Sequence, residues 1–461
     1  MYVSRSDSQQ QNKKRRRRRV RRLVVINFTM LAIILILVAV FWSTIFSSKQ
    51  SDGGLTSKAE HGNSDTNNAP SEPEQVDKPK AAPDISDSGQ HSAKDNSVKP
   101  PDTTDDAKPG DTESPSTDSS KPDDASNQPP AANEGEQGAA TDDSQQASSS
   151  VNLAFVGDIL LGSSVESTMR SQGFDYPFSG ALNLLTGADL TAGNLEGPIT
   201  TRGVPAQNKQ YVFKGAPDLL KSLTDSGFDV VSLANNHTLD QGAQGLLDTI
   251  KHLDKAGLPH MGGGNNDAEA FAPTILEASG VKVAYIGLSR VVPETNWKAD
   301  KDHPGVAETY DSTRAVAAIK KAKEQADLVV IMVHWGVERA EQPVEHQTTL
   351  ARQYIDAGAD LVIGSHPHVL QGFEQYKGKW IAYSLGNFVF NETATPRTKD
   401  TGVLEAACSK SGDCKLTIHP MVAKQSRPAP ADPDKAKEII SYLTRISLGA
   451  KVDAEGHIIS K

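Results

Sequence analysis

The sequence predicts an α/β fold built on two mixed sheets. Between residues 151 and 426, short apolar runs alternate with helical patterns, which is typical of a largely parallel sheet. Two further pairs of apolar runs are joined by tight turns and therefore predict antiparallel hairpins. Because a mixture of parallel and antiparallel strands is more easily divided between two sheets, we expect two. A folded part of about 270 residues is long enough for one large core.

A long apolar segment follows a basic N-terminal tail. Basic residues crowd positions 1–22, and residues 23–46 contain no ionisable side chain. At about 1.5 Å per residue, a helix of that length spans the roughly 30 Å hydrocarbon core of a membrane. A signal peptide has a shorter apolar region, so we expect an uncleaved anchor, with cleavage as the alternative. The positive-inside rule predicts a single-pass protein of the cell membrane, with a cytoplasmic N-terminus and an extracytoplasmic C-terminal domain.

Residues 47–150 are predicted to form a disordered linker. Small and polar residues dominate this segment, and it contains no aromatic residue. It offers too little apolar surface to offset the entropy lost on ordering. The linker is either a tether that holds the folded part off the membrane or a low-complexity spacer between two modules.

Charge is distributed unevenly along the chain. Residues 1–50 carry a net charge of +10, so the remainder carries −20 to give the total of −10. An acidic remainder argues against nucleic acid as a partner, and membrane topology explains the basic cluster.

Hydrophobic periodicity places the elements of the folded part, residues 151–426. Strands are predicted over 152–157, 189–194, 229–234, 281–288, 327–333, 360–364 and 380–385. Helices are predicted over 215–225, 244–256, 312–324 and 344–357. The hairpins join 274–276 to 281–286 and 373–376 to 380–384. The remaining residues, 427–461, are predicted to be a linker and a short helix over 435–446.

The two cysteines of the chain, Cys408 and Cys414, flank a Ser-Gly-Asp turn between two alternating runs. This pattern predicts a hairpin. Outside the cytoplasm we expect a disulfide that closes it, with free thiols as the alternative.

Six motifs put metal-capable side chains where predicted strands end. They are GD at 157–158, GNLE at 193–196, NNH at 235–237, VHWG at 333–336, GSHPH at 364–368 and SLGNF at 384–388. Loops at the carboxyl ends of strands are where an α/β sheet places its ligands. The motifs together therefore predict a metal centre built by the whole domain. The pair His366 and His368 is hard to explain structurally, because burying unpaired imidazoles is costly.

These motifs, in this order, resemble the motif set of the CapA family of capsule and poly-γ-glutamate biosynthesis proteins, which are PgsA-like, over residues 151–421. The family is similar to calcineurin-like metallophosphoesterases. The resemblance implies an α-β-β-α sandwich with two divalent ions, Mn, Fe or Zn, at the strand ends. It also implies a membrane-anchored component that works with polymer synthase subunits and with an anionic polymer such as poly-γ-glutamate.

The resemblance also implies a role for each motif. The implied metal ligands are Asp158, Glu196, Asn236, His334, His366 and His368. His237 is the implied general acid. We expect Asn194, Asn387 and Arg397 to line the cleft, with a loop salt bridge to Asp400 as the alternative for Arg397.

One motif departs from the metallophosphoesterase pattern. Those enzymes begin Asp-x-His, whereas this chain has Asp158-Ile159-Leu160, so one imidazole is missing. Two functions therefore stay open. The first is a metal-dependent hydrolase acting on a phosphoester or on an amide linkage of the polymer. The second is a non-catalytic accessory subunit that binds the polymer synthase and the emerging polymer.

Overall fold

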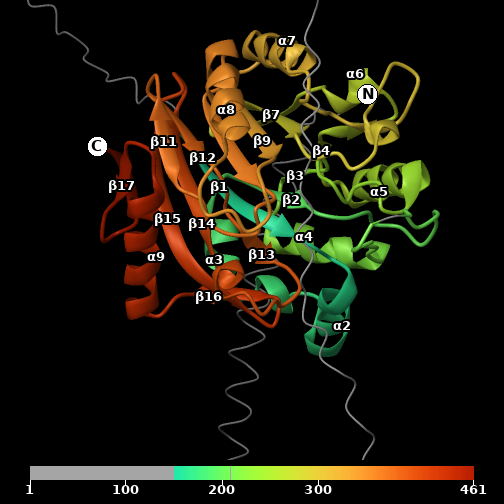
Figure 1. Ribbon diagram of the computed structural model, residues 1–461, viewed down its shortest axis with the longest axis horizontal. Coiled ribbons are helices and arrows are strands. Elements are labelled where there is room, and N and C mark those ends of the chain that lie inside the picture. The colour runs from blue at the N-terminus through green and yellow to red at the C-terminus, as the bar shows by residue number, and fades with distance from the viewer. Residues whose placement is uncertain (1–149, 208) are drawn as a thin grey trace, which may run out of the picture. The chain divides into compact units, whose positions relative to one another are not determined.

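The larger sheet of the molecule contains ten strands (Figure 1). The structure, a computed structural model, describes residues 150–207 and 209–461. The strand order is β17-β18-β15-β14-β1-β2-β3-β4, with β13 beside β1 and β16 beside β15. The bounds are β1 Ser150–Ile159, β2 Leu190–Leu195, β3 Val230–Ser232, β4 His260–Met261, β13 Asn387–Val389, β14 Asp400–Ser409, β15 Cys414–Lys424, β16 Arg427–Pro430, β17 Ala450–Val452 and β18 His457–Ser460. Strands β1 to β4 are parallel, and β1 also pairs antiparallel with β14.

The second sheet contains six strands in the order β11-β12-β10-β9-β7-β6. Their bounds are β6 Thr274–Ala278, β7 Val281–Ser289, β9 Leu328–His334, β10 Leu361–Ser365, β11 Phe373–Tyr376 and β12 Lys379–Ala382. The four central strands are parallel, and both predicted hairpins form its edges. A small third sheet pairs β5 Gly263–Gly264 with β8 Gly305–Val306. The prediction of a mixed α/β fold with more than one sheet is confirmed.

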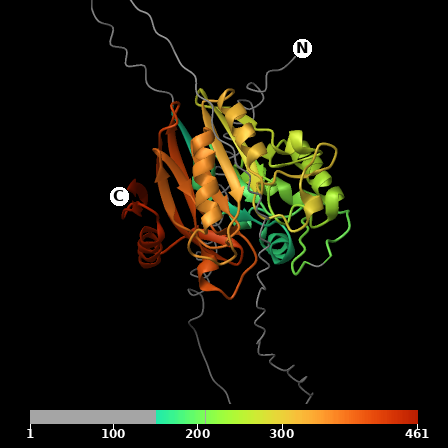
Figure 2. The ribbon, with the colours of Figure 1, turned by 45° about the horizontal axis from the view of Figure 1, so that its top comes forward.

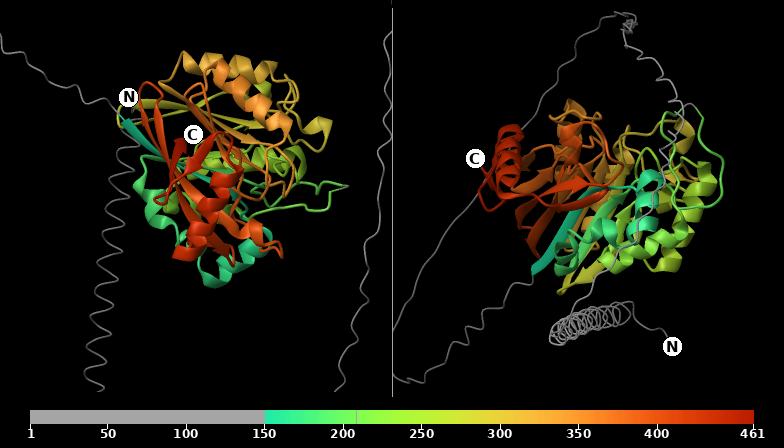
Figure 3. Two further views of the ribbon diagram at one scale, coloured as in Figure 1. Left: turned by 60° about the vertical axis from the view of Figure 1, so that its left-hand side comes forward. Right: turned by 90° about the horizontal axis from the view of Figure 1, so that it is seen from below.

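The two large sheets pack face to face, and helices cover their outer faces. Leu153 and Phe155 of β1 lie with Tyr285 of β7 in the core between the sheets. The alternate residues Ala154 and Val156 lie in a second core under the helices of the ten-stranded sheet. A third core lies between the six-stranded sheet and the helices α7, Thr313–Lys323, and α8, Glu345–Ala357. Seen from the side, strands lie between these two orange helices and the green ones (Figure 3).

Four of the helices in the described residues end directly before a glycine. The helices of the ten-stranded sheet are α2 Ser163–Gln172, α3 Leu182–Gly187, α4 Leu220–Ser226 and α5 Gly242–Ala256. Those of the six-stranded sheet are α6 Asp267–Ala270, α7 Thr313–Lys323 and α8 Glu345–Ala357. Helix α8 ends at Gly358, whose φ of 118° favours a residue without Cβ. Short 3₁₀ turns connect several of these elements.

The C-terminal residues belong to the folded core, where the sequence predicted a linker and a short helix. Helix α9, Pro433–Ile446, is capped by Asp432, which accepts a hydrogen bond from the backbone of Lys435. Its apolar face, including Ile439 and Leu443, is part of the core between the sheets. Strands β17 and β18 then complete the edge of the ten-stranded sheet, in red at one side of the molecule (Figure 2). Runs of three or four residues are too short for periodicity to indicate them.

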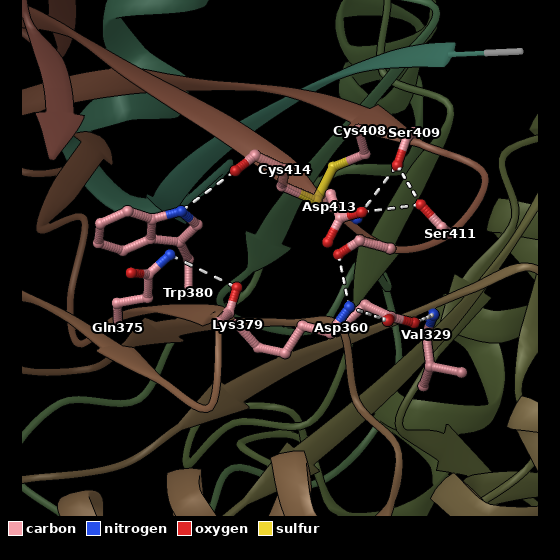
Figure 4. Close-up of a disulfide and its surroundings, with 12 residues drawn as sticks. Val329, Asp360, Gln375, Lys379, Trp380, Cys408, Ser409, Ser411, Asp413 and Cys414 are labelled. Atoms are coloured by element: carbon pink, nitrogen blue, oxygen red, sulfur yellow. Dashed lines mark hydrogen bonds and ion pairs between the residues drawn. A yellow bond between two sulfur atoms is a disulfide. The ribbon is translucent and has the colours of Figure 1, made fainter. Parts of the chain in front are cut away.

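A disulfide joins Cys408 to Cys414 beside the turn of the β14–β15 hairpin (Figure 4). The hairpin tip contacts the six-stranded sheet. The indole of Trp380 donates a hydrogen bond to the carbonyl of Cys414 at 3.1 Å. The ammonium of Lys379 donates to the carbonyl of Gly412 at 2.7 Å. The disulfide therefore stabilises a contact between the two sheets.

The predicted localisation is corrected here. The proposed anchor, residues 23–46, lies outside the described residues, as do the basic tail and the linker. Within residues 150–207 and 209–461, none of the helices is long and apolar enough to cross a membrane. This finding goes against the prediction of a single-pass membrane protein.

Candidate metal centre

Strands of both sheets end at one place, and the candidate ligands lie there. Asp158, near the end of β1, is in register with Asn194 of β2 and Asn387 of β13. His334 ends β9 and is in register with Ser365, which ends β10. Because parallel strands end at the same edge of a sheet, motifs far apart in the sequence come together.

His334 lies in the middle of a first group of donor atoms. Its Nε2 is 2.9 Å from Oδ1 of Asn236 and 3.1 Å from Nδ1 of His366. Its Nδ1 is 2.9 Å from the hydroxyl of Ser365, which can donate to it. A neutral imidazole carries one N–H, so His334 cannot satisfy all of these neighbours by donating. Amide oxygen and imidazole nitrogen atoms that converge in this way are suitable ligands for one divalent ion.

Asp158, Glu196 and His368 form a second group beside the first. Nδ1 of His368 is 3.3 Å from Oδ2 of Asp158, and its Nε2 is 3.8 Å from Oε1 of Glu196. Asp158 Oδ1 is also 3.9 Å from Nδ1 of His334. One atom each of Asp158, Glu196 and His334 lies within 4.8 Å of the others. The structure therefore brings all six predicted ligands into one cluster.

Glu196 shows that the cluster fits a metal. Its Oε1 is buried and has no hydrogen-bond partner among the described residues. The imidazole Nε2 atoms of His368 and His237 lie 3.8 and 3.9 Å away, too far for hydrogen bonds. Two atoms bound to the same ion at about 2.1 Å lie about 3–4 Å apart, so this spacing suits shared ligands. An unpaired buried oxygen costs about 1–3 kcal/mol, and a cation would remove that cost.

The electrostatics of the cluster follow from the burial of several ionisable groups close together. Burial, and then the charge of Asp158, raise the pKa of Glu196 well above its usual value. Burial also raises the pKa of Asp158, but hydrogen bonding and charge from His368 outweigh it and hold that pKa below its usual range. Burial lowers the pKa of His334 and lowers that of His366 to about 3. Both imidazoles are therefore neutral at pH 7, as metal ligands must be.

The loop after β10 has an unusual backbone at its two histidines. His366 has a φ of 97° and His368 a φ of 58°, which side chains with a Cβ rarely adopt. Such conformations cost about 1–3 kcal/mol and are found mainly at functional sites. The turn brings the backbone N–H of His366 to 3.4 Å from Oδ2 of Asp158. It also directs both imidazoles into the cluster.

His237 lies at the edge of the cluster with its own pair of partners. Its Nδ1 is 2.7 Å from Oδ2 of Asp240 and 3.0 Å from the ammonium of Lys209. A carboxylate only accepts and an ammonium only donates, so one tautomer cannot use both. Burial lowers the pKa of His237, although the hydrogen bond to Asp240 opposes this shift. Its other nitrogen, Nε2, faces Glu196.

Lys209 and Asp240 are site residues that the sequence analysis missed. The ammonium of Lys209 donates to the carbonyl of Asn236 at 2.6 Å and to the Asp240 carboxylate at 2.5 Å. It also lies 5.1 Å from the ring centre of Trp297. Asp240 follows His237 by three residues and could have been found from that spacing. Lys209 lies 28 positions before His237 in an irregular loop, where no pattern marks it.

Two of the three predicted cleft residues lie in the cluster. Asn194 donates to Oδ1 of Asp158 at 2.8 Å and to Oε2 of Glu196 at 3.3 Å, so it orients both carboxylates. Its own carbonyl oxygen accepts from Asn235 at 3.0 Å. Asn387 Oδ1 lies 2.9 Å from Nδ1 of His368.

Arg397, the third predicted cleft residue, makes its contacts elsewhere. It pairs with Asp400 at 3.1 Å and with Glu438 of α9 at 3.0 Å. Its guanidinium also lies 4.1 Å from the ring centre of Tyr442. These contacts match the salt bridge that was the alternative for this residue. Leu160, where metallophosphoesterases have a histidine, is buried and apolar and offers no ligand.

Two solved structures show a weak overall similarity to the chain. A phosphatase from Mycoplasma pneumoniae is 13% identical, with a TM-score of 0.38 over 63% of this chain and 97% of that one. The NAD nucleotidase of Haemophilus influenzae is 15% identical, with a TM-score of 0.37 over 65% of this chain and 64% of that one. Both TM-scores are below 0.5. The fold described above therefore rests on the strand pairing of this chain and not on these two structures.

Three curated relatives are much more similar in sequence. The PGA biosynthesis protein CapA of Bacillus subtilis is 36% identical, over 64% of this chain and 78% of that protein. The capsule biosynthesis protein CapA of Bacillus anthracis is 34% identical, over 61% and 69%. A probable polyglutamine synthesis accessory protein of Mycobacterium tuberculosis is 32% identical, over 46% and 59%.

A family model supports the same relationship. The model described as bacterial capsule synthesis protein PGA_cap matches residues 152–392, which include the whole ligand cluster. That match covers more than half of the chain, and it agrees with the identities of the Bacillus relatives. The chain belongs to the bacterial capsule synthesis protein family PGA_cap.

Proposed function

We propose that this chain is a component of poly-γ-glutamate capsule synthesis that carries a two-metal, hydrolase-like centre similar to that of calcineurin-like metallophosphoesterases. The observation that carries the proposal is the buried Oε1 of Glu196, which has no hydrogen-bond partner in the described part of the chain and lies among the five other candidate ligands. The names of the Bacillus relatives, for PGA and capsule biosynthesis, support the biological setting.

The ligands divide into two sets around Glu196. Asn236, His334 and His366 would hold one ion, Asp158 and His368 would hold the other, and Glu196 lies close to members of both sets. Carboxylate, amide and imidazole ligands suit Mn, Fe or Zn. When bound, such ions polarise a phosphoryl or carbonyl oxygen and lower the pKa of water.

The protein side chains would position the substrate and move a proton. His237 presents Nε2 toward the cluster while its Nδ1–H donates to Asp240, so the doubly protonated ring, which this carboxylate favours, can give the proton on Nε2 to a leaving group. The ring of Phe213 packs on His237, with the ring centres 4.4 Å apart, and limits its rotation. Asn194 donates to both carboxylates and would keep them oriented to hold the ions.

A second candidate function is a non-catalytic accessory subunit that binds the polymer synthase and the emerging polymer. Leu160 favours it, because a buried leucine stands where the related enzymes have an imidazole ligand. The Mycobacterium relative, named as an accessory protein, is consistent with this alternative.

Metal analysis and turnover together test the proposal. We expect His366→Ala and His368→Ala to lower the metal content of the purified protein, because each removes an imidazole ligand. His303→Ala is the control, since His303 is exposed and distant from the six motifs in sequence. Full metal content in the His366/His368 double variant would contradict the metal centre.

His237→Ala separates the two candidate functions. A general acid contributes about 10²–10⁴ in rate, so the hydrolase predicts a loss of that size in polymer hydrolysis with metal retained. Unchanged polymer output by cells that carry His237→Ala would favour the accessory subunit.

A further inference from the structure

A cationic residue lies directly beyond one of the strand ends that form the metal centre. Arg290 follows Ser289, the last residue of β7, and Ser289 is in register with His334. The backbone N–H of Arg290 donates to the carbonyl of His334 at 2.8 Å. Arg290 is therefore anchored by its backbone to a proposed metal ligand.

The side chain of Arg290 is held against an exposed aromatic ring. The backbone of Ser289 exchanges hydrogen bonds with Ala307 and Thr309, which brings the following residue, Tyr310, beside Arg290. The guanidinium carbon lies 3.9 Å from the ring centre of Tyr310, and the ammonium of Lys298 lies 4.4 Å from it. Two cations thus share one ring, and 46% of the tyrosine is exposed. Stacking fixes the guanidinium plane without using its N–H donors.

The nearby carboxylate of Glu308 pairs with Arg314 and lies close to Lys298, but it does not pair with Arg290. Glu308 accepts from Arg314 at 3.0 Å and lies 3.7 Å from the ammonium of Lys298. In the described part of the chain, no carboxylate oxygen lies within 4.0 Å of a guanidinium nitrogen of Arg290. The Tyr310 hydroxyl accepts from the backbone of Val292 at 3.2 Å, so its own proton stays available. Arg290 and Lys298 on the ring of Tyr310 thus form a positive patch, although the chain as a whole carries a net charge of −10.

We propose that Arg290, Tyr310 and Lys298 form a subsite for a carboxylate of an acidic polyamide chain that reaches the metal centre. The inference rests on the proposed function and names the substrate group that this site would bind. A guanidinium offers two parallel N–H donors that match a carboxylate, and the Tyr310 hydroxyl and Lys298 add donors beside it. The patch explains how a chain with an excess of acidic residues can hold an anionic polymer.

Binding of a labelled oligomer tests the subsite. The probe is a fluorescein-labelled hexamer of γ-linked glutamate, and its polarisation is measured with the full-length, metal-loaded protein at fixed ionic strength. We expect Arg290→Gln to raise Kd by about 10-fold or more, since hydrogen bonds to charged groups contribute about 1.5–3 kcal/mol. Arg290→Lys keeps the charge but loses the planar fork, so we expect an intermediate Kd.

Arg445→Gln is the matched control. Arg445 is exposed and also lies over a tyrosine ring, that of Tyr442, at 5.3 Å, but it belongs to α9 rather than to a strand end of the cluster. We expect this variant to bind the hexamer as tightly as the natural chain. Equal affinity of Arg290→Gln and the natural chain, or equal losses in Arg290→Gln and Arg445→Gln, would overturn the subsite.

Two further outcomes distinguish a carboxylate subsite from a phosphate subsite, and the subsite from the proposed function. If inorganic phosphate displaced the hexamer from the natural chain but not from Arg290→Gln, and acetate at the same ionic strength displaced it from neither, the assignment to carboxylate would be wrong. The assay requires no turnover, so it is independent of the proposed chemistry. If metal analysis contradicts the metal centre while Arg290→Gln still weakens binding, the proposed function fails and the subsite stands.

Discussion

At the scale of single residues, Asp240 decides which nitrogen of His237 carries the proton. Its carboxylate can only accept, so it holds one proton on Nδ1 and favours a second proton on Nε2, the nitrogen that faces the cluster. Asp240→Asn keeps the shape but can donate instead. We expect the ¹⁵N NMR signals of His237 to show loss of the Nδ1–H tautomer, and hydrolysis to fall by about 10²-fold or more. An unchanged tautomer would show that Lys209, not Asp240, controls this ring.

Buried histidines also predict how acid acts on the metal-free protein. The folded-state pKa of His366 is lowered to about 3, so the unfolded chain binds more protons below pH 6.5. Its contribution to stability is therefore present above pH 6.5 and is lost as the pH falls toward 3. His366→Gln should reduce this dependence by up to about 1.4 kcal/mol per pH unit, measured by urea unfolding from pH 7 to 5. The raised pKa of Glu196 makes its own contribution to stability fall as the pH rises, which opposes the effect of His366. The pH dependence of the unfolding free energy is therefore compared between His366→Gln and the natural chain.

The same measurement has a control in His303→Gln, because His303 is exposed. Its unfolding free energy should follow the pH dependence of the natural chain. Equal slopes for the natural chain and His366→Gln would contradict the buried neutral state of His366.

At the scale of elements, the disulfide of the β14–β15 hairpin should contribute to the stability of the fold without affecting metal binding. Cys408 is in register with Val151 at the start of β1, whereas Asp158 lies at the other end of that strand. Replacing both cysteines by serine removes a short closed loop, so we expect a loss of about 2 kcal/mol in unfolding free energy. Metal content should not change. A double variant that lost metal would show that the hairpin also positions the ligands.

The long strands could be predicted from the sequence, because parallel strands that are buried on both faces are continuous apolar runs. The site motifs could be predicted too, because ligands of such sheets lie just after the carboxyl ends of the strands. Strands β7, β9 and β10 lie within a residue of their predicted bounds, and the six predicted ligands meet. Strand β13 has three residues, and β1 rather than its own sequence decides its pairing. Lys209 reaches His237 from a loop, and such tertiary contacts leave no periodic pattern.

At the scale of the whole molecule, bound metal should connect the two sheets. Asp158, Glu196 and Asn236 come from the ten-stranded sheet and its loops, whereas His334 and His366 come from the six-stranded sheet. A ligand at 100 times its Kd stabilises the folded state by about 2.7 kcal/mol. We expect chelation by EDTA to lower Tm by several degrees, and Mn, Fe or Zn to restore it, in a thermal unfolding assay. A Tm that did not respond to chelation would argue against tight binding.

The left-handed backbone of His366 has a consequence for how this sequence can change. At a φ of 97°, glycine is relaxed and alanine is strained, so His366→Gly should unfold at higher urea than His366→Ala although both lack the imidazole. A population selected only for resistance to unfolding would therefore drift to glycine at this position. Histidine can persist at position 366 only while a function that requires its imidazole is also under selection.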